Sequence, residues 1–175
     1  MRPVGFYTNL YDFKTSIQGK GFLGAFLTLR FSGLWSLLSG KRGVIAANYG
    51  ADDRNPWVSP LDIASVVAEE LTGPFTARMF RYIASEELTC NQIAQIIGEA
   101  IGKPYLKWAL MSDKSMLSGL KMFGMPESRA RGVVEMNAGI HNGRVNEHYY
   151  RHRPEVMGKV KMKDFAKDFA ATYHQ

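Results

Sequence analysis

The stretch Asn55-Pro56-Trp57-Val58-Ser59-Pro60-Leu61-Asp62-Ile63-Ala64 decides the fold that the rest of the chain adopts. Ser59 is a preferred residue just before a helix, and Pro60 fits the first helical position, where no backbone N–H is needed. Asp62 follows three residues after the serine, where its carboxylate can accept the backbone N–H of the cap and lies near the positive end of the helix dipole. The stretch therefore predicts a helix that begins at Pro60.

The residues on either side extend this pattern. One face of the helix is expected to be apolar, with residues at helical spacing: Ile63, Val66, Val67 and Leu71. Upstream, the run from Gly43 to Asn48 is typical of a buried strand, and Tyr49-Gly50 closes it. A strand, a polar loop and a capped helix are thus predicted in this order. A strand and a helix that meet at a sheet edge, without any functional role, would show the same pattern.

The composition describes an ordinary globular chain. It has 175 residues, 46% of them apolar, which is enough for one domain with a real core and excludes a disordered or collagen-like chain. The single cysteine, Cys90, cannot form an internal disulfide, and no apolar run follows Arg2 as it would in a signal peptide. We therefore expect a cytoplasmic protein.

A net charge of +6 raises the question of a nucleic-acid partner. The basic residues are scattered, with mild concentrations at Lys41-Arg42 and from Arg144 to Arg153, and no nucleic-acid-binding motif accompanies them. We expect a solvated basic surface and no nucleic-acid partner.

The remaining elements are predicted from periodicity and capping signals. Strands are expected at 2–7, 77–84 and 106–110, and helices at 9–18, 89–101, 112–123 and 126–141, with a last helix that places 162, 165, 169 and 173 on one face. The second of these helices begins with a capping box, Thr89 to Gln92. This pattern predicts an α/β fold with more helices than strands, in a single domain that covers 1–175.

The most apolar segment runs from Phe22 to Leu38. Three interpretations are open: a helix or helix pair that lines a pocket, a helix on a membrane surface, and a membrane span. Arg30 near its middle argues against the span, because a charge at the bilayer centre is costly.

Three further patterns resemble functional motifs, but their context argues against each. Gly19 to Gly24 matches a dinucleotide-binding glycine pattern, although a predicted helix precedes it and no acidic residue follows before position 51. His148 and His152 could share a helix face and bind a metal ion, but Arg151 and Arg153 would repel a cation. Cys90 lies at a helix N-terminus, which lowers a thiol pKa, yet the capping box explains its neighbours. We expect no metal site.

The segment from Arg2 to Asn9 is a better candidate for a site. Proline and glycine allow a sharp turn at a strand end, which leaves Phe6 as an aromatic face and Asn9 as an amide. Open α/β folds bind ligands beyond the carboxyl ends of their strands. A pocket at this point and simple core packing of Phe6 are equally compatible with the spacing.

Three stretches taken together resemble the NmrA-like family of atypical short-chain dehydrogenase/reductases: Arg2 to Asn9, Pro56 to Ala64 and Glu87 to Ile93. The tail segments Val133 to Ala138 and Lys163 to Lys167 fit the same family, so the resemblance covers nearly all of the chain. It extends only to the second half of such proteins. The glycine-rich phosphate loop with which the family begins, and the Tyr-x-x-x-Lys pair of the wider superfamily, are absent from the sequence.

The resemblance implies the C-terminal part of a Rossmann-type NAD(P)-binding fold: a few parallel strands and a helical substrate-binding lobe. It places Pro3, Phe6 and Asn9 beside the nicotinamide of NAD(P)H, in a cofactor site that this chain leaves incomplete. It also places Phe6, Asn9, Trp57 and Met136 against a small-molecule substrate, and it assigns no catalytic residue. The partner it implies is the missing N-terminal half, or a second copy that covers an exposed sheet edge.

Three functions follow as hypotheses. The first is the substrate-binding portion of an oxidoreductase that transfers a hydride to a quinone-like, carbonyl or imine compound, inactive without its other half. The second is an NAD(P)-binding redox sensor without turnover. The third, a membrane-surface protein, depends on the segment from Phe22 to Leu38.

Overall fold

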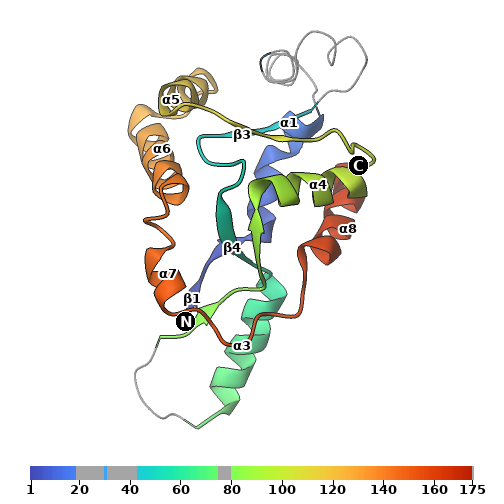
Figure 1. Cartoon of the computed structure of the whole chain (residues 1–175), viewed down its shortest axis with the longest axis vertical. Helices are drawn as coiled ribbons and strands as arrows, with labels where there is room; N and C mark the ends of the chain where they lie inside the picture. The colour runs from blue at the N-terminus through green and yellow to red at the C-terminus, as the bar shows by residue number, and fades with distance from the viewer. Residues whose placement is uncertain (19–29, 31–42, 75–79, 175) are drawn as a thin grey trace.

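The computed structural model describes residues 1–18, 30, 43–74 and 80–174, in which short strands lie among helices (Figure 1). The strands are β1 (Arg2–Pro3), β2 (Gly5–Phe6), β3 (Ile45–Ala47), β4 (Arg54–Val58), β5 (Tyr82–Ile83), β6 (Glu86–Thr89) and β7 (Trp108–Leu110). The helices are the 3₁₀-helix η1 (Tyr7–Phe13) and the α-helices α1 (Lys14–Gln18), α3 (Pro60–Thr72), α4 (Cys90–Ala100), α5 (Asp113–Met122), α6 (Glu127–His141), α7 (Glu147–Arg151) and α8 (Met162–Tyr173).

The described strands form three small sheets. β1 pairs with β5 and β3 pairs with β7, both in parallel. The third sheet has the order β2-β4-β6, in which β2 and β4 are parallel and β4 and β6 are antiparallel. The strand predicted at 2–7 is thus divided between two sheets, and Tyr7 begins η1 instead. Of the strand predicted at 77–84, residues 77–79 lie outside the described part and only Tyr82–Ile83 pairs.

The central strand β4 corrects a prediction, because Arg54–Val58 was expected to be part of a polar loop. Pro56 and Asn55 occur rarely in strands, so the local sequence does not indicate a strand here. The structure buries every residue of β4 after Arg54, and it pairs Trp57 with Gly5 on one side and with Glu86 on the other. Tertiary burial therefore overrides the local preference.

The predicted helix starts are confirmed. The Ser59 hydroxyl accepts the backbone N–H of Leu61, and Thr89 and Gln92 form the predicted capping box. Ser112 caps α5 in the same way. The helix predicted at 9–18 begins as η1, whose three-residue period brings Tyr7 and Leu10 to the same buried side.

The main apolar core lies between α4, α8 and η1. Three of the four residues predicted for one face of the last helix, Met162, Phe165 and Phe169, are buried in it, and the ring of Tyr11 stacks on Phe169 with centroids 5.3 Å apart. Trp108 of β7 closes the core. Burial of these aromatic rings is the main apolar contribution to stability.

Among the described residues, no helix combines the length and the apolar character that crossing a membrane requires. Apart from Arg30, the segment from Phe22 to Leu38 lies outside the described residues, as does the glycine pattern from Gly19 to Gly24. The interpretations offered for these two segments therefore stay predictions.

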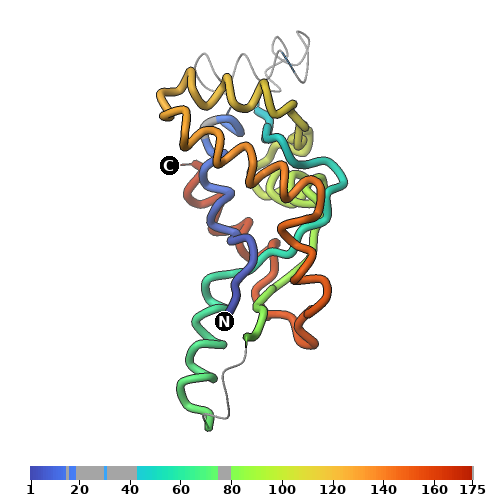
Figure 2. Tube along the Cα trace, turned by 90° about the vertical axis from the view of Figure 1, so that its left-hand side faces the viewer, coloured from blue at the N-terminus to red at the C-terminus, as the bar shows by residue number. Residues whose placement is uncertain are grey.

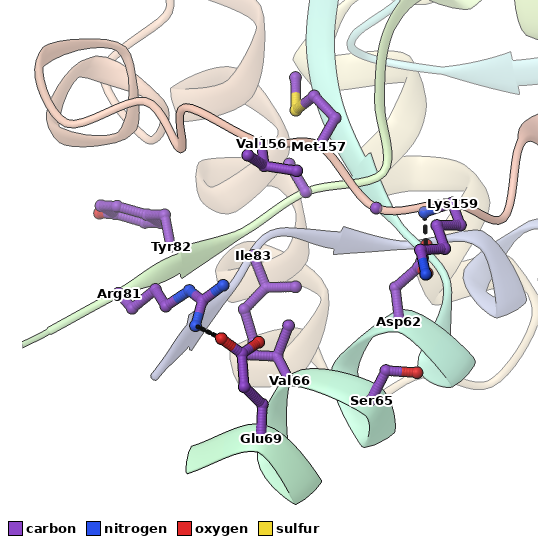
Figure 3. Close-up of a pocket in the computed structure, with 12 residues that line it drawn as sticks. Asp62, Ser65, Val66, Glu69, Arg81, Tyr82, Ile83, Val156, Met157 and Lys159 are labelled. Carbon is purple, nitrogen blue, oxygen red and sulfur yellow. Dashed lines mark hydrogen bonds and ion pairs between the residues drawn. The ribbon is translucent and has the colours of Figure 1, made fainter. Parts of the chain in front are cut away.

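Asp62 has a role that differs from the predicted one. Its carboxylate does not cap its own helix; it accepts the backbone N–H of Lys159 at 3.0 Å (Figure 3). It also accepts the Ser85 hydroxyl at 2.6 Å and the backbone N–H of Val160 at 3.1 Å. The N–H of Ser59 donates to the Ser85 hydroxyl instead. One buried acid thus joins the start of α3, the β5–β6 turn and the segment that leads to α8.

We predict that Asp62→Asn lowers the free energy of unfolding by about 2 to 3 kcal/mol, because an amide nitrogen would face three donors that now share a carboxylate. Urea unfolding followed by circular dichroism measures this loss. The matched control is Asp52→Asn, since Asp52 is exposed and, among the described residues, its side chain accepts from Asn91 alone, so its effect should stay within about 0.5 kcal/mol. Equal effects of the two substitutions would contradict this role of Asp62.

Candidate functional site

The segment predicted to flank a cofactor lies at an open edge. In the described part of the chain, β1 pairs only with β5 and β2 pairs only with β4, so each has one free side. Pro3 and Asn9 are exposed and Phe6 is partly buried. The side chain of Asn9 has no hydrogen-bond partner among the described residues. Phe6 and Asn9 are therefore accessible at the carboxyl end of β2 and are not sealed in the core.

Trp57 lies next to this edge. It is 4% exposed in β4, opposite Gly5, and a Cβ added to Gly5 would lie 3.5 Å from the indole ring. Its indole N–H is buried and has no hydrogen-bond partner among the described residues. A buried donor without an acceptor costs about 1 to 3 kcal/mol.

Met136 lies apart from these residues. It is 55% exposed on α6, whereas the adjacent Asn137 is buried and donates to the Asn48 side chain at 2.9 Å. Phe6 and Trp57 lie on paired strands but on opposite faces of the sheet, because Trp57 pairs with Gly5 and Phe6 pairs with Val58. Asn9 follows Phe6 in η1, and Met136 lies on a separate helix. The roles proposed for Pro3 and these four residues stay predictions.

A hollow of about 330 Å³ lies between α3, β5 and the segment 156–159 (Figure 3). Its apolar wall includes Val66, Ile83 and Val156. Its charged side is Arg81, which pairs with Glu69 at 3.3 Å and Glu70 at 3.1 Å. Hydrogen bonds to these two carboxylates raise the pKa of the Arg81 guanidinium. No pattern in the sequence indicates this hollow, because its walls come from three segments that are far apart in the chain.

A buried acid, Glu87, organises the other side of β6. Its side chain is 2% exposed and accepts two hydrogen bonds from the Arg153 guanidinium and one from the Tyr149 hydroxyl at 2.9 Å. It also forms an ion pair with Arg54, at 3.5 Å. Burial alone would raise the pKa of Glu87, but the hydrogen bonds from Arg153 and Tyr149 and the two positive charges outweigh it and lower that pKa. This cluster is an anchor for the segment that carries Arg153, since its polar groups pair with one another.

Cys90 is placed where a reactive thiol is excluded. It begins α4 but is fully buried in the main core. Burial, together with the nearby charge of Asp53, raises the pKa of the Cys90 thiol to about 12. The thiol is therefore protonated at neutral pH, and the capping interpretation of this segment is the correct one.

The two histidines predicted to share a helix face do lie together. The rings of His148 and His152 stack with centroids 4.3 Å apart, and His148 Nδ1 lies 2.9 Å from the Tyr82 hydroxyl. Partial desolvation, followed by the neighbouring His152 and Arg2, lowers the pKa of His148. In the described residues, no group of three or more histidine, cysteine or acidic side chains could hold a metal ion.

Comparison with solved structures identifies the fold. The NADPH-dependent quinone oxidoreductase of Escherichia coli, crystallised with NADPH, matches 96% of this chain and 52% of its own, with a TM-score of 0.65 and 14% identity. A nucleoside-diphosphate-sugar epimerase from Staphylococcus aureus matches 95% of this chain and 50% of its own, with a TM-score of 0.60 and 14% identity. The triphenylmethane reductase of Citrobacter, in complex with NADP(H), matches 73% of this chain and 44% of its own, with a TM-score of 0.57 and 20% identity.

No family model matches the sequence, and no curated protein matches it. At the identities found, the likeness to solved structures establishes the architecture alone. This architecture is the Rossmann-type α/β fold, as predicted. The chain spans about half the length of the structures it matches.

We predict an acid-sensitive contribution to stability from Glu87. Because its folded pKa lies below the ordinary value, the contribution is complete above about pH 4.3, where the unfolded glutamate is ionised, and it is lost as the pH falls further through the folded pKa. At pH 7, Glu87→Gln should therefore lower the free energy of unfolding by about 2 kcal/mol, and this difference from the parent should shrink below about pH 4.3. Denaturant unfolding at a series of pH values measures it.

The control for this prediction is Glu155→Gln, which alters an exposed carboxylate outside the cluster and should show no such pH dependence. A difference between Glu87→Gln and the parent that stays constant from about pH 7 to about pH 3 would contradict the ionised cluster.

Proposed function

We propose that this chain is the substrate-binding portion of an NAD(P)-dependent oxidoreductase that acts on a quinone-like or carbonyl compound. The observation that carries the proposal is the fold shared over 96% of the chain with a quinone oxidoreductase crystallised with NADPH. Since the match covers 52% of that protein, a complete cofactor site would need a dinucleotide-binding half in addition to these residues.

The open edge at β2 fits the nicotinamide end of such a cofactor. Phe6 and Asn9 lie where β2 ends, and ligands of open α/β folds bind beyond the carboxyl ends of strands. Phe6 and Pro3 would flank the nicotinamide ring, and the unpartnered amide of Asn9 would donate to a carboxamide or substrate oxygen. The pyrophosphate would bind to a helix N-terminus of the dinucleotide-binding half.

The chain's own residues would position the substrate and exclude water. When bound, the reduced nicotinamide supplies the hydride. Phe6 provides an apolar wall, and Trp57, whose side chain lies on the other face of the sheet, would orient a quinone or carbonyl oxygen there through an indole N–H that has no partner among the described residues. Met136 would reach the substrate only from α6, so its contribution depends on how that helix is placed.

The surface beside β1 supports a dinucleotide-binding half as the partner. The predicted apolar stripe of α3 is poorly covered: Ile63, Val66 and Val67 are only partly buried and Leu71 is 80% exposed. The helix projects from the body of the molecule (Figure 1 and Figure 2). A parallel strand added to the free side of β1, with its accompanying helices, would pair the edge and cover apolar surface together. Self-association through the same edge is the alternative.

We predict that Phe6→Ala and Asn9→Ala each lower kcat/KM for quinone reduction by about 10-fold to 100-fold in a protein that joins these 175 residues to a glycine-rich dinucleotide-binding half. Loss of the aromatic wall misplaces the ring, and loss of the amide removes one oriented donor. Steady-state NADPH oxidation with a panel of quinones and aldehydes measures the effect.

The matched controls are Phe123→Ala and Asn142→Ala, which truncate exposed side chains at the C-terminal ends of α5 and α6 and should leave kcat/KM unchanged. Unaltered rates in Phe6→Ala and Asn9→Ala would contradict the proposed site. NADPH binding without oxidation by any compound of the panel would instead favour a redox sensor.

A further inference from the structure

The helices α5, α6 and α7 form an arm, residues 112–153, that runs along one side of the molecule (Figure 1). In the described part of the chain, every backbone–backbone hydrogen bond made by the arm stays within it, from Met116 N–H to the Ser112 carbonyl at one end to His152 N–H and the Tyr149 carbonyl at the other. No sheet pairing or shared turn therefore ties the arm to the rest of the described fold.

The arm also takes no part in the main apolar core. The buried apolar clusters among the described residues contain no member of 112–153. α5 has no buried residue, and α6 buries only Ala130, Val134 and Asn137. α7 differs, because Tyr149 is 1% exposed and its ring packs edge-on against Tyr82 with centroids 5.4 Å apart. The hydrophobic burial that stabilises α4 and α8 is thus largely missing from α5 and α6.

Polar side chains attach the upper part of the arm instead. Asn48, which follows β3, donates to Asp113 at 2.9 Å and to the Val134 carbonyl at 3.0 Å, and it accepts from Asn137 at 2.9 Å. Further along α6, His141 Nδ1 lies 2.6 Å from the Asp53 carboxylate. These contacts follow the carboxyl end of β3 and the loop after it.

The same type of contact continues to the lower end of the arm. Asn146 donates to the Asn55 side chain at 2.7 Å, and the Tyr150 hydroxyl donates to the Arg54 carbonyl at 2.8 Å. The Glu87 cluster, described above, ends the series at Arg153. We call the whole series the polar ladder.

We infer that α5 and α6, with the turn up to Asn146, form a hinged lid, which swings away from β3 and β4 as a unit when its rungs of the polar ladder, at Asn48, Asp53 and Asn55, exchange their hydrogen bonds for water. Each such exchange costs little, whereas unfolding of α4 or α8 exposes apolar core. The hinges are Met111-Ser112, where the chain enters the lid, and Asn146-Glu147, where α7 begins and stays anchored through Tyr149 and Glu87.

Opening of the lid uncovers Asn48 and Asn55, at the end of β3 and within β4, close to Trp57. It also moves Met136, which α6 carries. If the proposed function holds, the lid admits substrate to the side of Trp57 and brings Met136 toward it on closing. This second statement rests on the proposed function, and the motion itself does not.

Hydrogen–deuterium exchange of the 175-residue chain, followed by mass spectrometry, tests the lid. Amides of α5 and α6 should exchange at least about 10-fold faster than those of α4 and α8, and they should do so together. Asn48→Ala should accelerate exchange in the arm by about a further 10-fold without changing α4 or α8. Asn146→Ala, at a less buried rung, should act in the same direction and more weakly.

The matched control is Asn91→Ala, since Asn91 is exposed on α4 and its side chain donates to Asp52, outside the polar ladder. It should leave exchange in the arm unchanged. Equal protection of the arm and of α4 would overturn the proposal, as would an Asn48→Ala variant in which the arm and the core accelerate equally. Both outcomes are readable whether or not the chain binds a cofactor.

Discussion

The fold depends on a single buried carboxylate, that of Asp62. It accepts donors from the Ser85 hydroxyl and from two successive backbone N–H groups, and so holds the β4–α3 junction, the β5–β6 turn and the approach to α8 in one place. Gly158 is required beside it, because an added Cβ would lie 2.2 Å from the carboxylate oxygen. The start of α3 and the segment 158–160, which are far apart in sequence, are held together at this point.

Two modes of attachment divide the molecule. Around Asp62, the packing of α4 and α8 on the strands buries aromatic and aliphatic side chains, so this part is rigid. In the arm, α5 and α6 are held mainly by hydrogen bonds between polar side chains, which water can replace at little cost, whereas α7 also packs Tyr149 against Tyr82. The predicted contacts Phe6, Asn9 and Trp57 lie on the rigid part, whereas Met136 lies on the arm. This division suits a site whose floor is fixed and whose cover moves.

Sequence reasoning succeeded where the signal is local. Ser59 and Thr89 begin helices because a hydroxyl next to a free backbone N–H acts over two or three residues. It failed for β4, since Pro56 suggests a loop until its partners on both sides are known. Asp62 was assigned to its own helix because its backbone partners lie 97 and 98 residues further along. The three bonds of Asn48 were likewise missed, as polar pairs between distant segments leave no periodic pattern.

The Rossmann-type architecture places the open edge of β1 and β2 at the centre of the functional account. Calorimetric titration with NADPH and NADH tests that account most directly, on this chain alone and on the chain joined to a glycine-rich dinucleotide-binding half. We expect no heat from the chain alone and a dissociation constant roughly in the nanomolar-to-micromolar range for the joined protein. No heat from the joined protein with either nucleotide would contradict it.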